Sequence, residues 1–172
     1  MPELLECQGL DAPLDEVWSF FSNAVNLASL TPPEQGLRVG KGGATPIFPG
    51  HRVQISVAPF GPFRSRWTTL IGDVVPPDEQ EKEAWFNDIQ LNGPFARWDH
   101  LHAFRAIPGG GVAVMDRVEY AVPLGRLGAW VAGRWVDRQI SALFAYRREQ
   151  LRHRFGEVDL PAGWEGGWTV GQ

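Results

Sequence analysis

The sequence predicts an α+β fold in which a curved, seven-stranded antiparallel sheet wraps around one long C-terminal helix, with two short helices and an internal cavity. Three observations lead to this prediction. Apolar residues alternate with a period of two from about residue 37 to residue 123, as in half-buried strands. The period becomes helical from residue 125 to residue 156. The chain also has eight Trp and ten Phe, large rings that suit a hollow domain as well as a solid one.

The length and composition indicate one globular domain. With 172 residues, 44% hydrophobic and 21% charged, the chain can bury a core without disulfides. The net charge is −4 and no run of Lys or Arg occurs, so the electrostatic footprint of nucleic-acid binding is missing. The one cysteine, Cys7, cannot form an internal disulfide, which agrees with a reducing compartment. Because we see neither a signal peptide nor a membrane span, we expect a cytoplasmic protein.

The N-terminal part predicts one strand and the two short helices. Residues 4–10 form the expected strand. Pro13 suits the first turn of the helix that follows, and one apolar face recurs at helical spacing in Leu14, Val17, Trp18 and Phe21. Residues 23–30 predict the second short helix, which Thr31-Pro32-Pro33 would end.

The period-two region predicts an antiparallel meander. The expected strands cover residues 51–57, 63–73, 83–91, 95–107 and 112–122. Breaks rich in Gly and Pro separate them, at residues 60–62, 76–78, 92–94 and 108–111. The charge run at residues 78–83 is expected to be a solvated turn.

The last part of the chain predicts a long helix and a tail. The helical segment carries an apolar stripe formed by Leu127, Val131, Val136, Ile140, Leu143, Phe144, Leu151 and Phe155, and Gly156 is its expected end. We therefore predict a domain over residues 1–156 and a loosely attached Gly/Trp-rich tail over residues 157–172. Trp164 and Trp168 could pack the tail on the body or on a partner. The helix would lie across the concave side of the sheet, and the space between them is the natural pocket.

Several segments carry a family resemblance. They are Ala12-Pro13-x-x-x-x-Trp18-x-Phe20-Phe21, Phe86-x-Asp88-x-Gln90-x-x-Gly93-Pro94-Phe95-x-x-Trp98-x-His100-x-His102-x-Phe104, Asp116-x-Val118-x-Tyr120-x-x-Pro123, Gly125-x-Leu127-Gly128 and Phe144-x-Tyr146-Arg147. From about residue 3 to residue 156 the chain resembles the START/SRPBCC superfamily, in particular a bacterial ligand-binding SRPBCC branch described as polyketide cyclase/dehydrase-like. The resemblance implies a helix-grip (START-like) fold with an internal cavity. It also implies lipid, sterol, plant-hormone or polyketide ligands, or aromatase/cyclase activity.

A polar group is expected inside the apolar cavity. On the strand over residues 95–107, one face carries Trp98, His100, His102 and Phe104, while the charged residues occupy the other face. If Gly109 is the pivot of the next hairpin, His102 lies opposite Asp116, His100 opposite Val118, and Trp98 opposite Tyr120.

The position of Asp88 depends on the turn that follows it. A tight Asn92-Gly93 turn would place Asp88 opposite Arg97 on the outer face, whereas one extra loop residue or a bulge would bring it beside Trp98 on the inner face. We prefer the inner position, because Pro94 disfavours a tight hairpin.

Three interpretations of this polar cluster stay open. His102 with Asp116, and His100 with Asp88, could act as acid and base in a cyclase or dehydratase. The residues could instead satisfy one another as buried polar groups must. The preferred interpretation lies between these two: the cluster orients the polar end of a ligand. The full predicted ligand-binding set is Trp67, Phe86, Asp88, Gln90, Trp98, His100, His102, Phe104, Asp116, Tyr120, Ile140 and Phe144. Arg147 lies near the apolar stripe, where it could turn inward to a carboxylate or extend to water, and extension to water is the default expectation.

The preferred function is therefore binding of a hydrophobic or aromatic small molecule, lipid- or polyketide-like, without catalysis. A cyclase or dehydratase is the alternative, and a protein-interaction module that uses the Trp-rich tail is the third. We expect no cofactor. His100-x-His102 raises metal binding, but we predict no metal because the sequence defines no spacing for a third ligand. A homodimer is considered as a further partner.

Overall fold

Seven antiparallel strands form one sheet in the order β1-β7-β6-β5-β4-β3-β2. The computed structural model describes residues 2–60, 63–78 and 82–170. The strands are β1 (Glu3–Leu10), β2 (Arg38–Val39), β3 (Arg52–Phe60), β4 (Phe63–Val75), β5 (Glu83–Asn92), β6 (Arg97–Ala106) and β7 (Val112–Ala121). The expected turn at 60–62 and the expected solvated run at 78–83 include residues 61–62 and 79–81, which lie outside the described residues.

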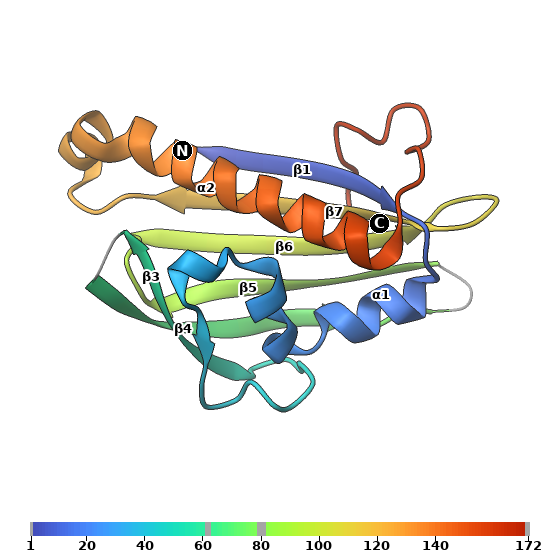
Figure 1. The fold of residues 1–172 in the computed structure, drawn as a ribbon, viewed down its shortest axis with the longest axis horizontal. Coiled ribbons are helices and arrows are strands. Elements are labelled where there is room, and N and C mark those ends of the chain that lie inside the picture. The colour runs from blue at the N-terminus through green and yellow to red at the C-terminus, as the bar shows by residue number, and fades with distance from the viewer. Residues whose placement is uncertain (1, 61–62, 79–81, 171–172) are drawn as a thin grey trace.

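One long helix, α2 (Gly125–Phe155), lies across the sheet (Figure 1). The buried apolar residues described on it are Val136, Ile140, Phe144, Leu151 and Phe155, all from the expected stripe. The side chains of Leu127 and Val131 lie outside the described part. The helix ends at Gly156, whose φ of 76° favours glycine over residues with a Cβ. The predicted sheet and C-terminal helix are thus confirmed. Among the described helices, none is long and apolar enough to cross a membrane.

Three short helical segments lie over the β5–β3 side of the sheet (Figure 1). They are α1 (Leu14–Phe21), η1 (Ala24–Leu30) and η2 (Pro33–Gln35). Pro13 precedes α1, and the α1 residues Val17, Phe20 and Phe21 are buried. The second expected helix forms as a 3₁₀ helix, which Thr31, Pro32 and Pro33 follow. Because proline has no backbone N–H to donate, the chain cannot continue the helix there.

The inner face of the sheet holds two separate apolar clusters. One gathers around α1 and the C-terminal end of α2, with Phe104 and Val114 from β6 and β7. The other gathers further along the helix, with Trp98 and Val118 from the same two strands. The buried polar residues His100, His102, Asp116 and Arg147 therefore occupy the interval between two hydrophobic cores.

The strand registers explain how these polar residues meet. β6 and β7 pair His102 with Asp116, His100 with Val118, and Trp98 with Tyr120, as predicted. Asp88 does lie on the inner face, but it pairs with His100, so the expected position beside Trp98 is wrong.

The β5–β6 connection accounts for this difference. Its loop is longer than the sequence suggested, because the amide of Gln90 bonds to the backbone of Phe95 in both directions, at 2.7 and 3.3 Å. The longer loop moves Asp88 two residues further along β6.

The tail packs on the outer face of the sheet, on the body of the protein. Leu160, Trp168 and Val170 contact an apolar cluster of β1, β6 and β7 residues, namely Cys7, Leu101, Ala103 and Met115. The guanidinium of Arg105 lies 5.4 Å from the ring centroid of Trp164 and 5.1 Å from that of Trp168. The tail is thus held by apolar contacts and by the contact of one cation with two indole rings.

Candidate ligand-binding site

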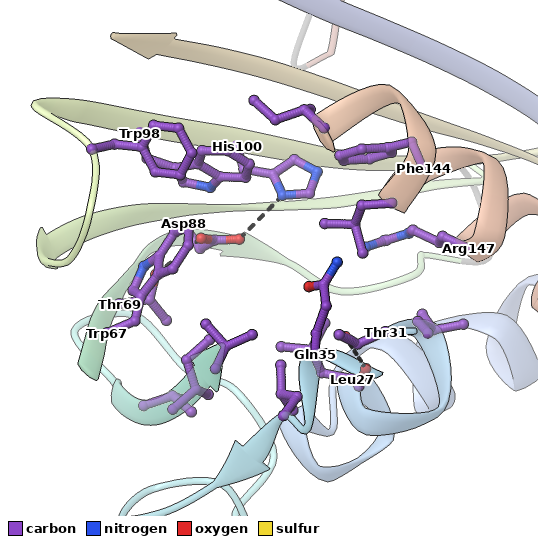
Figure 2. A pocket seen from close by; sticks show the side chains of 18 of the residues that line it. Leu27, Thr31, Gln35, Trp67, Thr69, Asp88, Trp98, His100, Phe144 and Arg147 are labelled. Atoms are coloured by element: carbon purple, nitrogen blue, oxygen red, sulfur yellow. Dashed lines mark hydrogen bonds and ion pairs between the residues drawn. The ribbon is translucent and has the colours of Figure 1, made fainter. Parts of the chain in front are cut away.

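A cavity of about 190 Å³ lies between the sheet, α2 and the short helices. In Figure 2, Leu27, Thr31 and Gln35 of the short helical region bound one side, and Phe144 and Arg147 of α2 bound another. Trp67, Thr69, Asp88, Trp98 and His100 belong to the side of the wall that the sheet forms. An apolar cavity of about 150 Å³ is known to hold a benzene molecule, so this volume suits at least an aromatic ring.

Seven residues of the sequence-predicted set line this cavity. They are Trp67, Asp88, Trp98, His100, His102, Ile140 and Phe144. Strand alternation carries five of them to the inner face, and helical periodicity carries the other two. The patterns that predicted the secondary structure thus also indicated part of the wall.

The other five predicted residues lie outside the lining of this cavity. Phe86 stacks on His102 with ring centroids 4.3 Å apart, and Phe104 is fully buried in the apolar cluster near α1. Gln90 closes the β5–β6 loop. Tyr120 donates a hydrogen bond to Asp137 Oδ1 at 2.7 Å, and burial, followed by this carboxylate, raises the pKa of its phenol. Asp116 lies behind the histidines, where it contacts the ring nitrogens described next.

Asp116 Oδ1 is the centre of the polar cluster. It lies 3.0 Å from His100 Nε2, 2.7 Å from His102 Nδ1 and 3.1 Å from Arg147 Nη2. Asp116 is 5% exposed and Arg147 6% exposed, so this ion pair is almost fully removed from water. The default expectation that Arg147 would extend to water is therefore wrong. The buried carboxylate on β7 explains the inward position, because a buried charge requires a partner.

Asp88 contacts the opposite edges of the same two rings. Its Oδ2 lies 3.1 Å from His102 Nε2 and 3.6 Å from His100 Nδ1. Thr69 donates its hydroxyl to Asp88 Oδ1 at 2.9 Å. Each histidine thus lies between two carboxylates, with Asp116 on the side of the long helix and Asp88 on the side of the cavity wall.

The surroundings shift the pKa values in different directions. Burial opposes ionisation of Asp116, but the Arg147 guanidinium and the histidines outweigh burial and hold the pKa of that carboxyl well below its usual range. The pKa of Asp88 is also lowered, because its contacts with His102 and His100 outweigh burial. Burial, assisted by the charge of His102, lowers the pKa of His100 to about 4. For His102, the bonds to Asp116 and Asp88 overcome burial and raise the pKa. The same two carboxylates are thus accompanied by opposite pKa shifts in the two rings.

Aromatic side chains fix the orientation of both imidazole rings. His100 contacts Phe144 edge-on at 5.7 Å and Trp98 at 6.1 Å between ring centroids. His102 is stacked on Phe86 and contacts Phe21 edge-on at 6.2 Å. The two imidazole rings at the cavity are therefore held in one orientation by their neighbours.

Sequence reasoning missed several residues of the cavity wall. Leu30, Thr31, Gln35, Thr69, Leu143 and Arg147 all contribute to it. Leu143 belongs to the predicted apolar stripe, and Thr69 has the inward parity of Trp67 on β4, so both carried a usable signal. Thr31 and Gln35 come from the irregular segments around η1 and η2, where no periodicity indicates the direction of a side chain.

Comparison with known proteins places this architecture among solved structures. No protein-family model and no curated protein matches the sequence. The aromatase/cyclase Zhui from Streptomyces sp. R1128 is 13% identical with a TM-score of 0.65, over 89% of this chain and 92% of that chain. TTHA0849 from Thermus thermophilus is 16% identical with a TM-score of 0.57, over 89% and 99%. Major latex-like protein 151 from Panax ginseng is 13% identical with a TM-score of 0.57, over 90% and 97%. At these identities the likeness shows the fold alone: the chain has the helix-grip fold of these solved structures.

Proposed function

We propose that the protein binds a hydrophobic or aromatic small molecule, lipid- or polyketide-like, in the cavity between the sheet and α2. This proposal rests on the separation of apolar and charged residues over the cavity wall. Aliphatic and aromatic residues form most of it, whereas Asp88, His100, His102 and Arg147 are gathered in one region. A ligand with an apolar body and one polar end matches such a wall, because each part then meets a surface of its own kind.

The polar end would be oriented by the cluster of Asp88, His100, His102 and Arg147. Asp116 pairs with Arg147, and the raised pKa of His102 favours a second cation beside the two carboxylates. The cluster is thus close to charge balance, with donors and acceptors both present at the wall. Such a site favours a ligand with oxygen atoms that can accept from His102 or Arg147.

Fluorescence titration with 8-anilino-1-naphthalenesulfonate, an aromatic probe with an anionic end, tests this proposal. Leu143 lines the cavity, so Leu143→Trp should fill part of it and weaken probe binding about tenfold or more, equivalent to at least about 1.4 kcal/mol. Leu91, which is 48% exposed and outside the cavity, provides the matched control Leu91→Trp. Equal affinities for the two variants would contradict the proposal.

A cyclase or dehydratase is the second candidate, favoured by one observation. His100 and His102 both line the cavity instead of lying behind apolar side chains, so an imidazole nitrogen can reach a bound carbonyl compound. One structural neighbour is described as an aromatase/cyclase.

A simple assay for this chemistry is hydrogen–deuterium exchange at the carbon between the carbonyls of a 1,3-diketone in D₂O, followed by NMR. A base removes a proton from that carbon to form the enolate, and return of a deuteron completes the exchange. A rate above the buffer background that disappears in His102→Gln would support catalysis. A rate equal to the background would leave binding as the function.

The interaction-module hypothesis is less well supported. The tail packs on the outer face of the sheet, where Trp164 and Trp168 contact each other and Arg105. A partner that used these indole rings would first have to displace them from Arg105. The packing of the tail thus argues against a role of these two indole rings in partner recognition.

A further inference from the structure

Three potential metal ligands converge at the cavity wall. Asp88 Oδ2 lies 3.1 Å from His102 Nε2 and 3.6 Å from His100 Nδ1, and the three ligand atoms all lie within 4.8 Å of one another. We propose that Asp88, His100 and His102 bind a divalent transition-metal ion such as Zn²⁺. With metal–ligand distances of about 2.0–2.2 Å, neighbouring atoms on a coordination shell lie about 3–3.5 Å apart, so the two separations require only small adjustments.

Asp116 supplies the outer shell that such a site requires. Its Oδ1 contacts the nitrogen of each ring that faces away from Asp88, His100 Nε2 at 3.0 Å and His102 Nδ1 at 2.7 Å. Metal-ligating histidines generally donate their second N–H to a carboxylate, a carbonyl or water, which fixes the tautomer and the ring orientation. Arg147 in turn pairs with Asp116, and Thr69 donates to Asp88 Oδ1 at 2.9 Å. The three ligating residues are thus all oriented by further contacts.

When neither ring carries an added proton, the cluster lacks a positive charge beside Asp88, and a metal ion would take the place of the proton that otherwise makes His102 a cation. If both rings donate to Asp116, the lone pairs of His100 Nδ1 and His102 Nε2 face Asp88 Oδ2, which is itself an acceptor. Three acceptors that converge in a buried region repel one another unless a cation or an added proton lies among them. A metal ion satisfies all three at once.

The donor set indicates the class of metal and its coordination. Two imidazole nitrogens and one carboxylate oxygen suit Zn²⁺ or Fe²⁺, whereas Mg²⁺ and Ca²⁺ prefer oxygen ligands alone. All three residues line the cavity, and Figure 2 shows Asp88 and His100 facing one another at its wall. A coordination position would thus remain open toward the cavity, as in reactive metal sites and unlike closed structural ones.

The open coordination position also indicates the chemistry of the organic ligand in the cavity. Only this part of the inference rests on the proposed function. Arg147 compensates Asp116, so Asp88 is the one carboxylate left to balance a doubly charged ion. An anionic oxygen at the open position would complete the balance. The polar end of the bound molecule is therefore inferred to be a carboxylate, or the enolate of a 1,3-dicarbonyl compound. The sequence alone defined no third ligand; the register of β5 on β6 supplies it as Asp88.

Metal binding is tested on the protein without any organic ligand. The protein is treated with EDTA, exchanged into chelator-free buffer and titrated with Zn²⁺ by calorimetry, with bound metal determined by mass spectrometry. The expected result is one equivalent per chain. Asp88→Asn and His102→Gln should bind at least about tenfold more weakly, and Asp116→Asn, which alters only the outer shell, about 10- to 100-fold more weakly. His153→Gln is the matched control, because His153 forms a histidine–carboxylate contact with Glu149 on the exposed surface of α2.

Two kinds of result would overturn the metal-binding proposal. No bound zinc in the wild type would overturn the proposal, and so would a zinc affinity that His102→Gln leaves unchanged or that depends on His153. Far-UV circular dichroism checks that the variants are folded. Co²⁺ added to the wild type gives a readout that needs no variant: intense visible d–d bands are expected for four-coordinate nitrogen and oxygen ligation, and their absence would contradict it. Because no organic ligand is present, metal binding and probe binding are tested independently. Metal binding can fail while probe binding to the cavity succeeds, and probe binding can fail while metal binding succeeds.

Discussion

The charge pair of Asp116 and Arg147 provides the most informative stability prediction. Asp116→Asn keeps the size of the side chain but removes the negative charge that Arg147, His100 and His102 share. Both Asp116 and Arg147 are almost fully removed from water, with 5% and 6% exposure. Breaking such a buried pair typically costs about 3–5 kcal/mol, because the remaining charge is left without compensation.

The matched control is Asp99→Asn on the outer face of β6. Asp99 pairs with Arg97 at 3.5 Å, but the two side chains are 35% and 51% exposed, so we expect a loss of only about 0–1 kcal/mol. Small domains are stable by about 5–15 kcal/mol in total, so the two variants should be easy to distinguish.

The assay is urea unfolding at neutral pH, followed by tryptophan fluorescence and circular dichroism in the presence of EDTA. Combining Asp116→Asn with Arg147→Met should cost less than the sum of the single changes, because neither charge is then left alone. If Asp116→Asn destabilises the protein no more than Asp99→Asn does, the description of the cluster as a buried ion-pair network is refuted.

Three further predictions concern the core, the tail and the pH. Phe144→Ala should lower the free energy of unfolding by about 3–5 kcal/mol and enlarge the cavity at the α2 wall, measured by urea unfolding and by binding of a bulkier aromatic probe; unchanged stability would contradict the buried position of Phe144. Gly9→Ala should release the tail, because a Cβ at Gly9 would clash with the backbone carbonyl of Val158; limited proteolysis should then cut residues 157–172 faster than in the wild type, and equal rates would refute the packing. In EDTA, stability should fall as the pH drops from 6.5 toward 4, because burial, assisted by the charge of His102, lowers the pKa of His100 to about 4 and the unfolded chain binds a proton that the folded protein does not. His100→Gln should reduce the pH dependence of the free energy of unfolding in that window. An equal pH dependence in the wild type and in this variant would argue against the lowered pKa of His100.

Much of the architecture was predictable because simple periodicities govern it. Alternation on β6 placed Trp98, His100 and His102 on the inner face, and glycine at 109–111 fixed the hairpin that pairs β6 with β7. All three glycines adopt positive φ, at 96°, 129° and 85°, which few other residues tolerate. The contact between His102 and Asp116 followed from that one pivot.

Other features depend on contacts that no periodicity encodes. The partner of Asp88 is set by the bond between the Gln90 side chain and the Phe95 backbone, which lengthens a loop whose sequence suggested a shorter one. Arg147 points inward because a carboxylate on a distant strand lies beneath it, which only the placement of α2 on the sheet reveals. The packing of the tail likewise depends on the apolar outer face of β1, β6 and β7.

Native mass spectrometry of the protein purified from its own host tests the central claim most directly. The wild type and Leu143→Trp are compared, and any bound compound is released by mild organic extraction. The account predicts a small apolar compound with an oxygen-bearing polar end on the wild type, strongly reduced on the variant. Equal occupancy of the two proteins, or no adduct on the wild type, would contradict the claim that this cavity holds the natural ligand.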